Sequence, residues 1–214
     1  MHFDVSGRLR QARVSRGLSL RSVATAVGVS PSLLSQVETG KTQPSVATLY
    51  SLVNLLDVSL DALLRDEEPA PDPANDMQMP SAHRPPSYEQ AFRDNTIQRA
   101  ADNPLIQMQN GVVWERLAVG GSDLADPLIV TYEPGASSVV DERLMRHAGT
   151  EFGCILEGEL TLKLDFDTFV LHAGDSFSFR SERPHLYVNA SAEPVRGVWF
   201  VLGRRDSLDD RVSG

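Results

Sequence analysis

A proline-rich and acidic stretch divides the sequence into two parts with different patterns. The stretch RDEEPAPDPANDMQMPSAHRPPS, residues 65–87, has no apolar periodicity and is typical of a semi-extended linker. Before it, apolar residues recur at helical spacing; after it, short apolar runs alternate with Gly, Pro, Asp and Asn. A chain of 214 residues is long enough for each part to bury its own core. The sequence therefore predicts a helical domain joined to an all-β domain.

The expected limits follow from these patterns. We expect a helical domain over residues 1–65, a linker over 66–91, a β-domain over 92–203 and a polar tail over 204–214. The β-domain contains the runs LIVTY, ELTLKLDF, FVLHAG, DSFSF, HLYVN and VWFVL. Their spacing of roughly 8 to 12 residues is typical of a β-sandwich or barrel.

Charge differs between the two parts. The net charge of −9 argues by itself against binding to nucleic acid. Through residue 65, however, seven Lys or Arg face four acids, a balance of +3 that leaves −12 for the remainder. This asymmetry indicates a basic module joined to an acidic one.

Cysteine content and hydropathy limit the cellular context. Cys154 is the only cysteine, so no intramolecular disulfide can form, and we expect it to be an ordinary buried thiol. The start, MHFDVSGRLRQAR, lacks the apolar segment of a signal peptide, and no window approaches the ~20 apolar residues of a membrane span. We expect a soluble cytoplasmic protein without a membrane partner.

The first part contains two predicted short helices, each with a serine N-cap at its start and a glycine just after its end. Ser19 is a good N-cap for LRSVATAV, and Gly28 follows the last apolar position. Ser30 caps SPSLLSQVET, which has Pro31 at its first helical position and Gly40 just past its end. Only a tight turn separates these two helices.

The second of these helices has an apolar side and a polar, uncharged side. Its apolar side carries Leu33, Leu34 and Val37, and its polar side carries Ser32, Ser35, Gln36 and Thr39. A solvated helix face usually favours Lys and Glu, whereas Gln can bind adenine through two hydrogen bonds and Ser accepts several bases. Arg and Lys elsewhere in this part supply the charge that phosphate binding requires. The pattern favours binding to double-stranded DNA over a simple helical bundle.

The stretch from LRQAR to LDALL resembles the helix-turn-helix of the XRE family, which is related to phage repressors. The resemblance covers residues 5–64 and runs through GLS, VGVS, LSQVETGK, PSVATL and VSLDALL. It implies a five-helix domain whose recognition helix spans residues 30–39, and a structural pair between Arg13 and Glu38. It implies base contacts by Pro31, Ser32, Ser35 and Gln36, and phosphate contacts by Ser19, Ser30, Lys41 and Thr42.

The second part, from about residue 95 to residue 203, resembles the cupin fold, a double-stranded β-helix barrel. The first cupin motif is matched by His147, Glu151 and Gly158, and Met145 stands where a further His is usual. The second motif is matched by AGDSFSF and PHLYVN, which contain His185 and Asn189. His172 replaces a common proline and is not expected to be a ligand.

The spacing of His147 and Glu151 decides whether both can hold one ion. Four residues of extended strand span about 13 Å, whereas two ligands of one ion must approach within about 4 Å. The chain must therefore bend between them, and Gly149 is the residue that tolerates such a bend.

Two interpretations of this cluster stay open. His147, Glu151 and His185 have the composition of the iron-binding facial triad, and zinc, manganese or nickel could also bind. Loss of one family ligand to Met145 lowers the expected metal affinity. Alternatively, the three side chains bind one another or an organic ligand in a dry barrel. We favour the organic ligand, with no cofactor required and a divalent metal as the alternative.

Strand alternation extends this predicted pocket. Arg143 and Met145 share parity with His147, and Tyr187 shares it with His185. The predicted effector-binding residues are Arg143, Met145, His147, Glu151, His185 and Tyr187. Arg143 could bind a carboxylate, or it could form a surface salt bridge.

Three functions are compatible with this organisation. The favoured one is a transcription regulator in which the helical domain binds operator DNA as a homodimer and the barrel senses a small-molecule effector. The second is a metal-dependent cupin enzyme, an oxygenase or isomerase, fused to a DNA-binding module. The third is an antitoxin-like or purely structural binder. The specific helix-turn-helix motif and the incomplete ligand set favour the regulator and argue against an enzyme.

Overall fold

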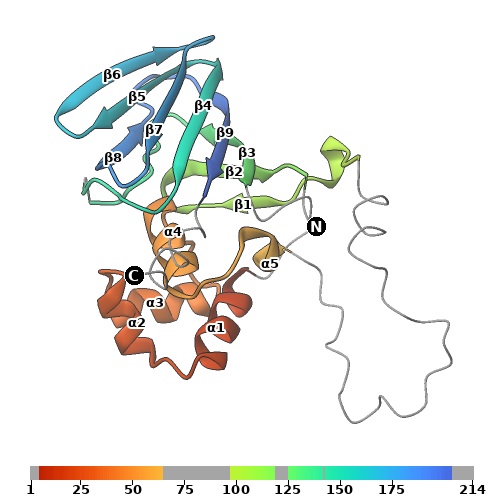
Figure 1. Cartoon of the computed structure of the whole chain (residues 1–214), viewed down its shortest axis with the longest axis vertical. Helices are drawn as coiled ribbons and strands as arrows, with labels where there is room; N and C mark the ends of the chain where they lie inside the picture. Colours follow the sequence, from red (N-terminus) through yellow and green to blue (C-terminus); the bar gives the residue numbers. More distant parts are fainter. Residues whose placement is uncertain (1–4, 65–96, 119–124, 142, 204–214) are drawn as a thin grey trace, which may run out of the picture.

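The computed structural model describes residues 5–64, 97–118, 125–141 and 143–203. Five helices form one body, which lies below a β-barrel in Figure 1. The predicted helical and all-β domains are thus confirmed. The predicted linker (66–91) and tail (204–214) lie outside the described residues, so the predicted domain limits stay predictions.

The helices are short and begin where the sequence indicates. They are α1 (Val5–Ser15), α2 (Leu20–Ala26), α3 (Pro31–Glu38), α4 (Val46–Leu55) and α5 (Leu60–Leu64). The Ser19 and Ser30 side chains accept hydrogen bonds from the Ser22 and Leu33 amides at 3.0 and 3.1 Å, so both predicted N-caps are confirmed. Ser45 caps α4 in the same way, at 3.1 Å from the Thr48 amide.

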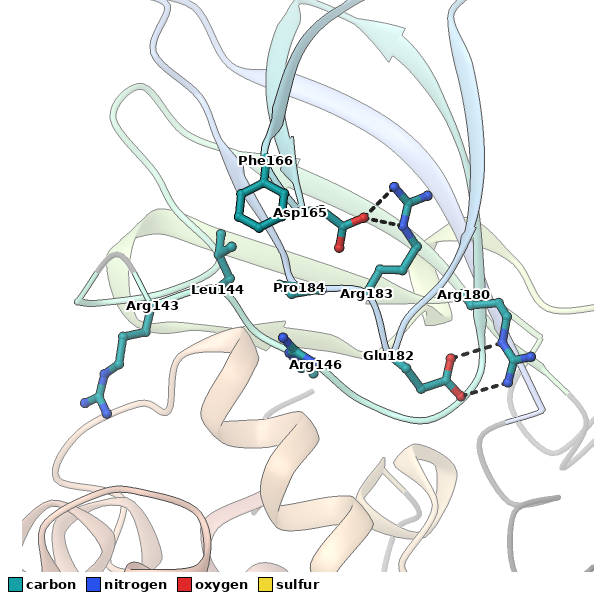
Figure 2. Close-up of a pocket in the computed structure, with 9 residues that line it drawn as sticks. All are labelled: Arg143, Leu144, Arg146, Asp165, Phe166, Arg180, Glu182, Arg183 and Pro184. Atoms are coloured by element: carbon teal, nitrogen blue, oxygen red, sulfur yellow. Dashed lines mark hydrogen bonds and ion pairs between the residues drawn. The ribbon is translucent and has the colours of Figure 1, made fainter.

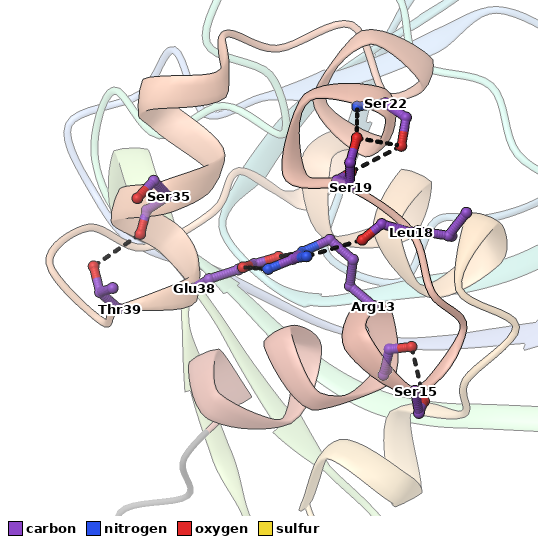
Figure 3. A network of polar contacts seen from close by, with 9 residues as sticks. Arg13, Ser15, Leu18, Ser19, Ser22, Ser35, Glu38 and Thr39 are labelled. Carbon is purple, nitrogen blue, oxygen red and sulfur yellow. Dashed lines mark hydrogen bonds and ion pairs between the residues drawn. The ribbon is translucent and has the colours of Figure 1, made fainter.

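A buried ion pair joins α1 to the end of α3 (Figure 3). The Arg13 guanidinium donates to both carboxylate oxygens of Glu38 at 2.7 Å and to the Leu18 carbonyl at 2.9 Å. The Glu38 side chain is only 3% exposed. The predicted Arg13–Glu38 pair is confirmed, and it fixes the end of α3 against α1.

Two antiparallel sheets enclose the core of the β-domain. The six-stranded sheet has the order β1-β2-β3-β9-β4-β7 and the three-stranded sheet the order β6-β5-β8. Their bounds are β1 (Leu105–Gln107), β2 (Val112–Arg116), β3 (Ala125–Tyr132), β4 (Thr150–Glu157), β5 (Glu159–Leu164), β6 (Asp167–His172), β7 (Ser176–Arg180), β8 (His185–Val188) and β9 (Val195–Leu202). Two single 3-10 turns, η1 (Ala100–Asp102) and η2 (Gln109–Gly111), flank β1.

Alternate residues of β3, β4 and β9 are buried, as expected for strands with one face toward a core. In β4, Glu151, Gly153 and Ile155 point inward and Phe152 points outward. On the outward face Phe152 is paired with Phe200 of β9, and the two residues are 41% and 42% exposed. The six-stranded sheet therefore has an uncovered apolar outer face among the described residues.

Helix α4 packs against the barrel. The Ala47 amide donates to the Ser138 carbonyl at 3.2 Å, and the Gln109 amide donates to the Pro44 carbonyl at 2.9 Å. A buried ion pair adds to these contacts: Arg116 Nε of β2 lies 2.7 Å from Asp61 Oδ1 of α5. The two domains are consequently in direct contact, which the sequence did not predict.

Within the described residues, no helix combines the length and apolar character needed to cross a membrane.

The Arg13–Glu38 pair can be tested by comparing two arginines of the same region. Arg13→Ala leaves a buried carboxylate without its partner and should lower the free energy of unfolding by about 3 kcal/mol. Arg16, which is 40% exposed and faces Asp57, serves as control; Arg16→Ala should cost less than about 1 kcal/mol. Denaturant titration of both full-length variants measures the difference. Equal losses would contradict a structural role for Arg13.

Candidate functional site

The predicted base-contacting residues lie together on one side of α3. Pro31, Ser32, Ser35 and Gln36 are all exposed. Within the described part of the chain, the Gln36 side chain makes no hydrogen bond, so its amide is available to a base edge. The apolar side of α3 packs inward, since Leu34 and Val37 are fully buried. The helix thus presents a short, uncharged polar row to solvent.

The predicted phosphate-contacting residues surround this row. Ser19 and Ser30 are exposed at the starts of α2 and α3, where free backbone amides favour anions. Lys41 is exposed just after α3, and Thr42 is half-buried. Their positions suit a surface that approaches a DNA backbone from the side of α3.

The barrel interior contains a second cluster of polar side chains. His147 Nε2 and His185 Nε2 lie 2.8 and 3.0 Å from the same oxygen, Glu151 Oε1. The other oxygen, Oε2, accepts a hydrogen bond from the Tyr187 hydroxyl at 2.7 Å. All four residues are buried. The bend predicted between His147 and Glu151 is present, because Gly149 has φ +107° and β4 begins only at Thr150.

The outer nitrogens of both imidazoles contact backbone carbonyls. His147 Nδ1 lies 3.1 Å from the Ala148 oxygen, and His185 Nδ1 lies 2.8 Å from the Arg183 oxygen. A carbonyl can only accept, so Nδ1 carries a proton in each ring. Carbonyl partners of this kind orient metal-binding histidines. The inner nitrogens, Nε2, therefore face Glu151 Oε1, and a neutral ring would present a lone pair there.

Three atoms of this cluster converge without hydrogen-bond partners. His147 Nε2, His185 Nε2 and Glu151 Oε1 are close, but their angles are not those of hydrogen bonds among the described residues. Buried polar atoms usually have partners, so a convergent set without them marks a place for a ligand or an ion. The three side chains also form the only group among the described residues whose donor atoms could hold one metal ion, all within 4.8 Å. The donor set fits a divalent metal.

The electrostatics of the cluster are dominated by Glu151. Burial alone would raise its pKa, but the adjacent imidazoles of His147 and His185 hold the pKa below its ordinary value. Burial and the Glu151 charge raise the pKa of Tyr187, so its hydroxyl stays neutral and donates. Glu151 is thus a buried carboxylate with one oxygen open for a further positive partner.

Aromatic side chains form the walls around this carboxylate. A small cavity of about 20 Å³ is lined by Val46, Tyr50, Trp114, Leu128, Val130, Tyr132, Met145, Glu151, Tyr187 and Trp199. Met145 and Tyr187 occupy the inward positions expected from alternation. The cavity has room for about one water molecule or an ion. Two of its lining residues, Val46 and Tyr50, come from α4 of the helical domain.

Arg143 was predicted to line the effector pocket, and this prediction is wrong. Its side chain is 77% exposed and paired with Asp141, and it points away from the barrel in Figure 2. Strand parity fails here because Met145 forms only an isolated bridge to His185, so no regular strand carries the alternation back to Arg143. Arg143 instead forms a surface salt bridge with Asp141, which was the alternative prediction for this residue.

Arg143 instead borders a large open depression of about 1060 Å³ (Figure 2). Its other lining residues are Leu144, Arg146, Asp165, Phe166, Arg180, Glu182, Arg183 and Pro184. Arg180 pairs with Glu182, and Arg183 with Asp165, so most of its positive charge is neutralised. The small inner cavity is the stronger candidate site, because Glu151, which carries one of the converging unpartnered atoms, lines it.

The remaining motif residues have structural positions. The Asn189 amide donates to the Tyr132 and Glu193 carbonyls at 2.9 and 2.8 Å and closes a turn. His172 is 65% exposed beside Glu159 and lies outside the cluster. Cys154 is half-buried and faces away from Glu151.

Comparison with known proteins gives the same division of the chain. Residues 9–63 match the helix-turn-helix family, and residues 128–201 match the cupin domain family. The HTH-type transcriptional regulator PuuR of Escherichia coli is 27% identical over 186 residues, covering 86% of this chain and 87% of PuuR. The HTH-type transcriptional regulator SutR of the same organism is 24% identical over 196 residues, covering 89% of this chain and 90% of SutR.

The chain thus combines a helix-turn-helix domain with a cupin domain, and along most of its length it is similar to HTH-type transcriptional regulators. A solved HTH_3 family transcriptional regulator from Vibrio cholerae shares the fold of this regulator, with a TM-score of 0.60 and 21% identity over 94% of this chain and 96% of the other. The regulator therefore has the predicted five-helix DNA-binding domain and cupin barrel.

The cupin position occupied by Met145 offers a test of this geometry. Met145→His restores a fourth ligand beside His147, Glu151 and His185, and it should tighten Co²⁺ binding by at least about tenfold. Titration calorimetry on the full chain measures the affinity, and Met145→Leu is the matched control. If Met145→His binds Co²⁺ no more tightly than Met145→Leu does, the side chain at position 145 does not reach the place where His147, Glu151 and His185 converge.

Proposed function

We propose that this regulator binds operator DNA through α3 as a homodimer and that a small organic effector occupies its barrel and modulates DNA binding. The observation that carries the proposal is the buried carboxylate of Glu151, which has an open oxygen inside an aromatic cavity. That cavity belongs to a chain whose recognition helix presents a free polar row. The sensing and the DNA-binding surfaces are thus both present in one molecule.

The DNA-binding part of the proposal rests on residue chemistry. Gln36, Ser32 and Ser35 would contact base edges, with Pro31 beside them, because short polar side chains permit close approach to the major groove. Ser19, Ser30, Lys41 and Thr42 would contact phosphates and set the position of α3. DNA binding then depends on side chains that the barrel does not cover.

The effector part rests on the acceptors in the barrel. With both rings neutral, the two imidazole Nε2 atoms and Glu151 Oε1 all accept, and their common partner would then be a donor or a cation. An organic effector would supply such a group and would bury its apolar part against the aromatic walls. Met145, His147, Glu151, His185 and Tyr187 would be its contacts.

A divalent metal is the second candidate for the same place, because the three donors fit one. If bound, it would be held by His147, Glu151 and His185 and would supply a Lewis-acidic anchor for an oxygen of the effector. We propose no required cofactor and no catalytic role. The near full-length relatives named as transcriptional regulators support a non-enzymatic function.

The homodimer rests on the uncovered outer face of the six-stranded sheet. Phe152 and Phe200 lie side by side there, and Leu156, further along β4, is 46% exposed. Exposed apolar patches of this kind mark interaction surfaces. A second copy placed on this face would give two recognition helices for two half-sites. We propose a cytoplasmic location, in keeping with this role.

Gln36→Ala should weaken binding to the preferred DNA site by about 1 to 3 kcal/mol and leave binding to random duplex unchanged. The site is first selected from a pool of random duplexes, and we expect half-sites about 10 base pairs apart or a multiple of this. Anisotropy titrations on both duplexes measure the effect, with the exposed Gln11 of α1 as control (Gln11→Ala). Equal loss on both duplexes would refute base reading by Gln36.

Lys41→Ala should weaken binding to the preferred site and to random duplex alike, and it should flatten the salt dependence of binding.

Glu151→Gln should abolish retention of the effector, since it keeps the size of the side chain but removes its charge. Native mass spectrometry of the full-length protein purified from cells should show an organic adduct that survives dialysis against a chelator. Glu159→Gln, at an exposed carboxylate beside His172, should retain the adduct. An adduct that is a metal ion and disappears with the chelator would favour the second candidate.

A further inference from the structure

Tyr50 of the DNA-binding domain stacks on the cupin cluster. Its ring lies 4.3 Å from the His147 ring, centroid to centroid, at an interplanar angle of 12°. It also lies 5.0 Å from the Trp114 ring of β2. Tyr50 is only 4% exposed, although it projects from α4 and not from the barrel. One side chain of the helical domain therefore closes the candidate ligand site.

The cavity beside Glu151 is too small for an organic molecule. Its volume of about 20 Å³ accommodates one water or ion, while drug-sized ligands need hundreds of cubic ångströms. Some wall of the site must therefore move before an organic effector can reach Glu151.

Tyr50 belongs to the wall that can move as a unit. Trp114, Tyr132 and Trp199 are fixed in β2, β3 and β9, whose backbones pair with one another along the sheet. Tyr50 projects from α4, which pairs with no strand: its backbone contacts with the barrel are the Ala47–Ser138 hydrogen bond and, just before the helix, the Gln109–Pro44 hydrogen bond. Moving a sheet strand breaks a ladder, whereas α4 is held by side-chain packing, by these two backbone hydrogen bonds and by the Asp61–Arg116 pair of the neighbouring α5. Helix α4 is therefore the wall of the site that can move without breaking a sheet.

We propose that Tyr50 is the lid of the barrel: an effector enters by displacing the Tyr50 ring from His147, and in doing so it shifts α4 and the recognition helix relative to the barrel. The inference rests on the proposed function, because it takes the barrel as the sensing site. It adds that the DNA-binding domain itself contributes Tyr50 and Val46 to the site, so effector and Tyr50 compete for one place.

Histidine accessibility tests the lid without a known effector. Diethyl pyrocarbonate modifies uncharged imidazoles, and peptide mass spectrometry reads each histidine separately. In the full-length wild type, after dialysis against a chelator, His147 and His185 should react far more slowly than the exposed His172. Tyr50→Ala should raise the rates at His147 and His185 at least about tenfold and leave His172 unchanged.

Matched variants separate a lid from general loosening. Tyr50→Phe keeps the ring and should keep His147 protected, and Leu55→Ala, at an exposed position of α4, should behave as wild type. Tyr50→Leu keeps apolar volume without a ring and should unmask His147 even if Tyr50→Ala folds poorly. The lid proposal is wrong if His147 stays protected from diethyl pyrocarbonate in both Tyr50→Ala and Tyr50→Leu, or if His147 reacts rapidly in the wild type.

Binding to the selected DNA site tests the link to α4. Tyr50→Ala should weaken this binding by about fivefold or more in the absence of effector, while Tyr50→Phe should not. Unchanged affinity of Tyr50→Ala would contradict the shift of the recognition helix. If the wild type selects no DNA site but Tyr50→Ala unmasks His147, the proposed function fails and the lid stands. If the wild type binds its selected site but His147 stays protected in the ring-less variants, the lid fails and the proposed function stands.

Discussion

The contact between α4 and α5 and the barrel is the constraint on which the rest of this regulator depends. Arg116 is 1% exposed in β2, and its guanidinium is compensated by Asp61 of α5 at 2.7 Å and by the Leu117 and Pro127 carbonyls. An arginine buried so completely is strongly destabilising without its carboxylate. Asp126 of β3 adds a second carboxylate at 3.8 Å, but the nearer one, Asp61, comes from the other domain, so the helical domain stabilises the described form of the barrel.

The same contact explains why the ligand site is closed. Asp61 and Arg116 hold α5 at one edge of the barrel, and α4 then brings Tyr50 onto His147. Glu151 below it is ionised and has an open oxygen, so the site is electrostatically prepared for a positive partner while remaining sterically shut. Closure by α4 places the lid of the barrel site in the same helical domain as the recognition helix α3.

Local chemistry made much of this structure predictable. Ser19 and Ser30 cap helices because their hydroxyls satisfy amides three residues ahead, and such short-range effects are visible in sequence. The His147, Glu151 and His185 cluster followed from motif spacing, and Gly149 from the bend that the spacing required. Met145 and Tyr187 followed from alternation next to these residues.

The contributions of distant residues were not predictable. Tyr50 reads as one more apolar position of a helix, and nothing in its neighbourhood indicates that its ring meets a histidine almost a hundred residues later. Asp61 likewise reads as an ordinary first-turn acid of a helix. Arg143 was misplaced because alternation holds only inside a regular strand, and the segment before Met145 is not one.

The claim that both domains form one cooperative unit is tested most directly by following unfolding with two probes. Both tryptophans, Trp114 and Trp199, lie in barrel strands, so their fluorescence reports the barrel, whereas far-ultraviolet circular dichroism reports mainly the helices. For the full-length wild type, we expect coincident denaturant transitions from both probes. Loss of the helical signal at a clearly lower denaturant concentration than the fluorescence change would show that the domains are only tethered, and would contradict this expectation.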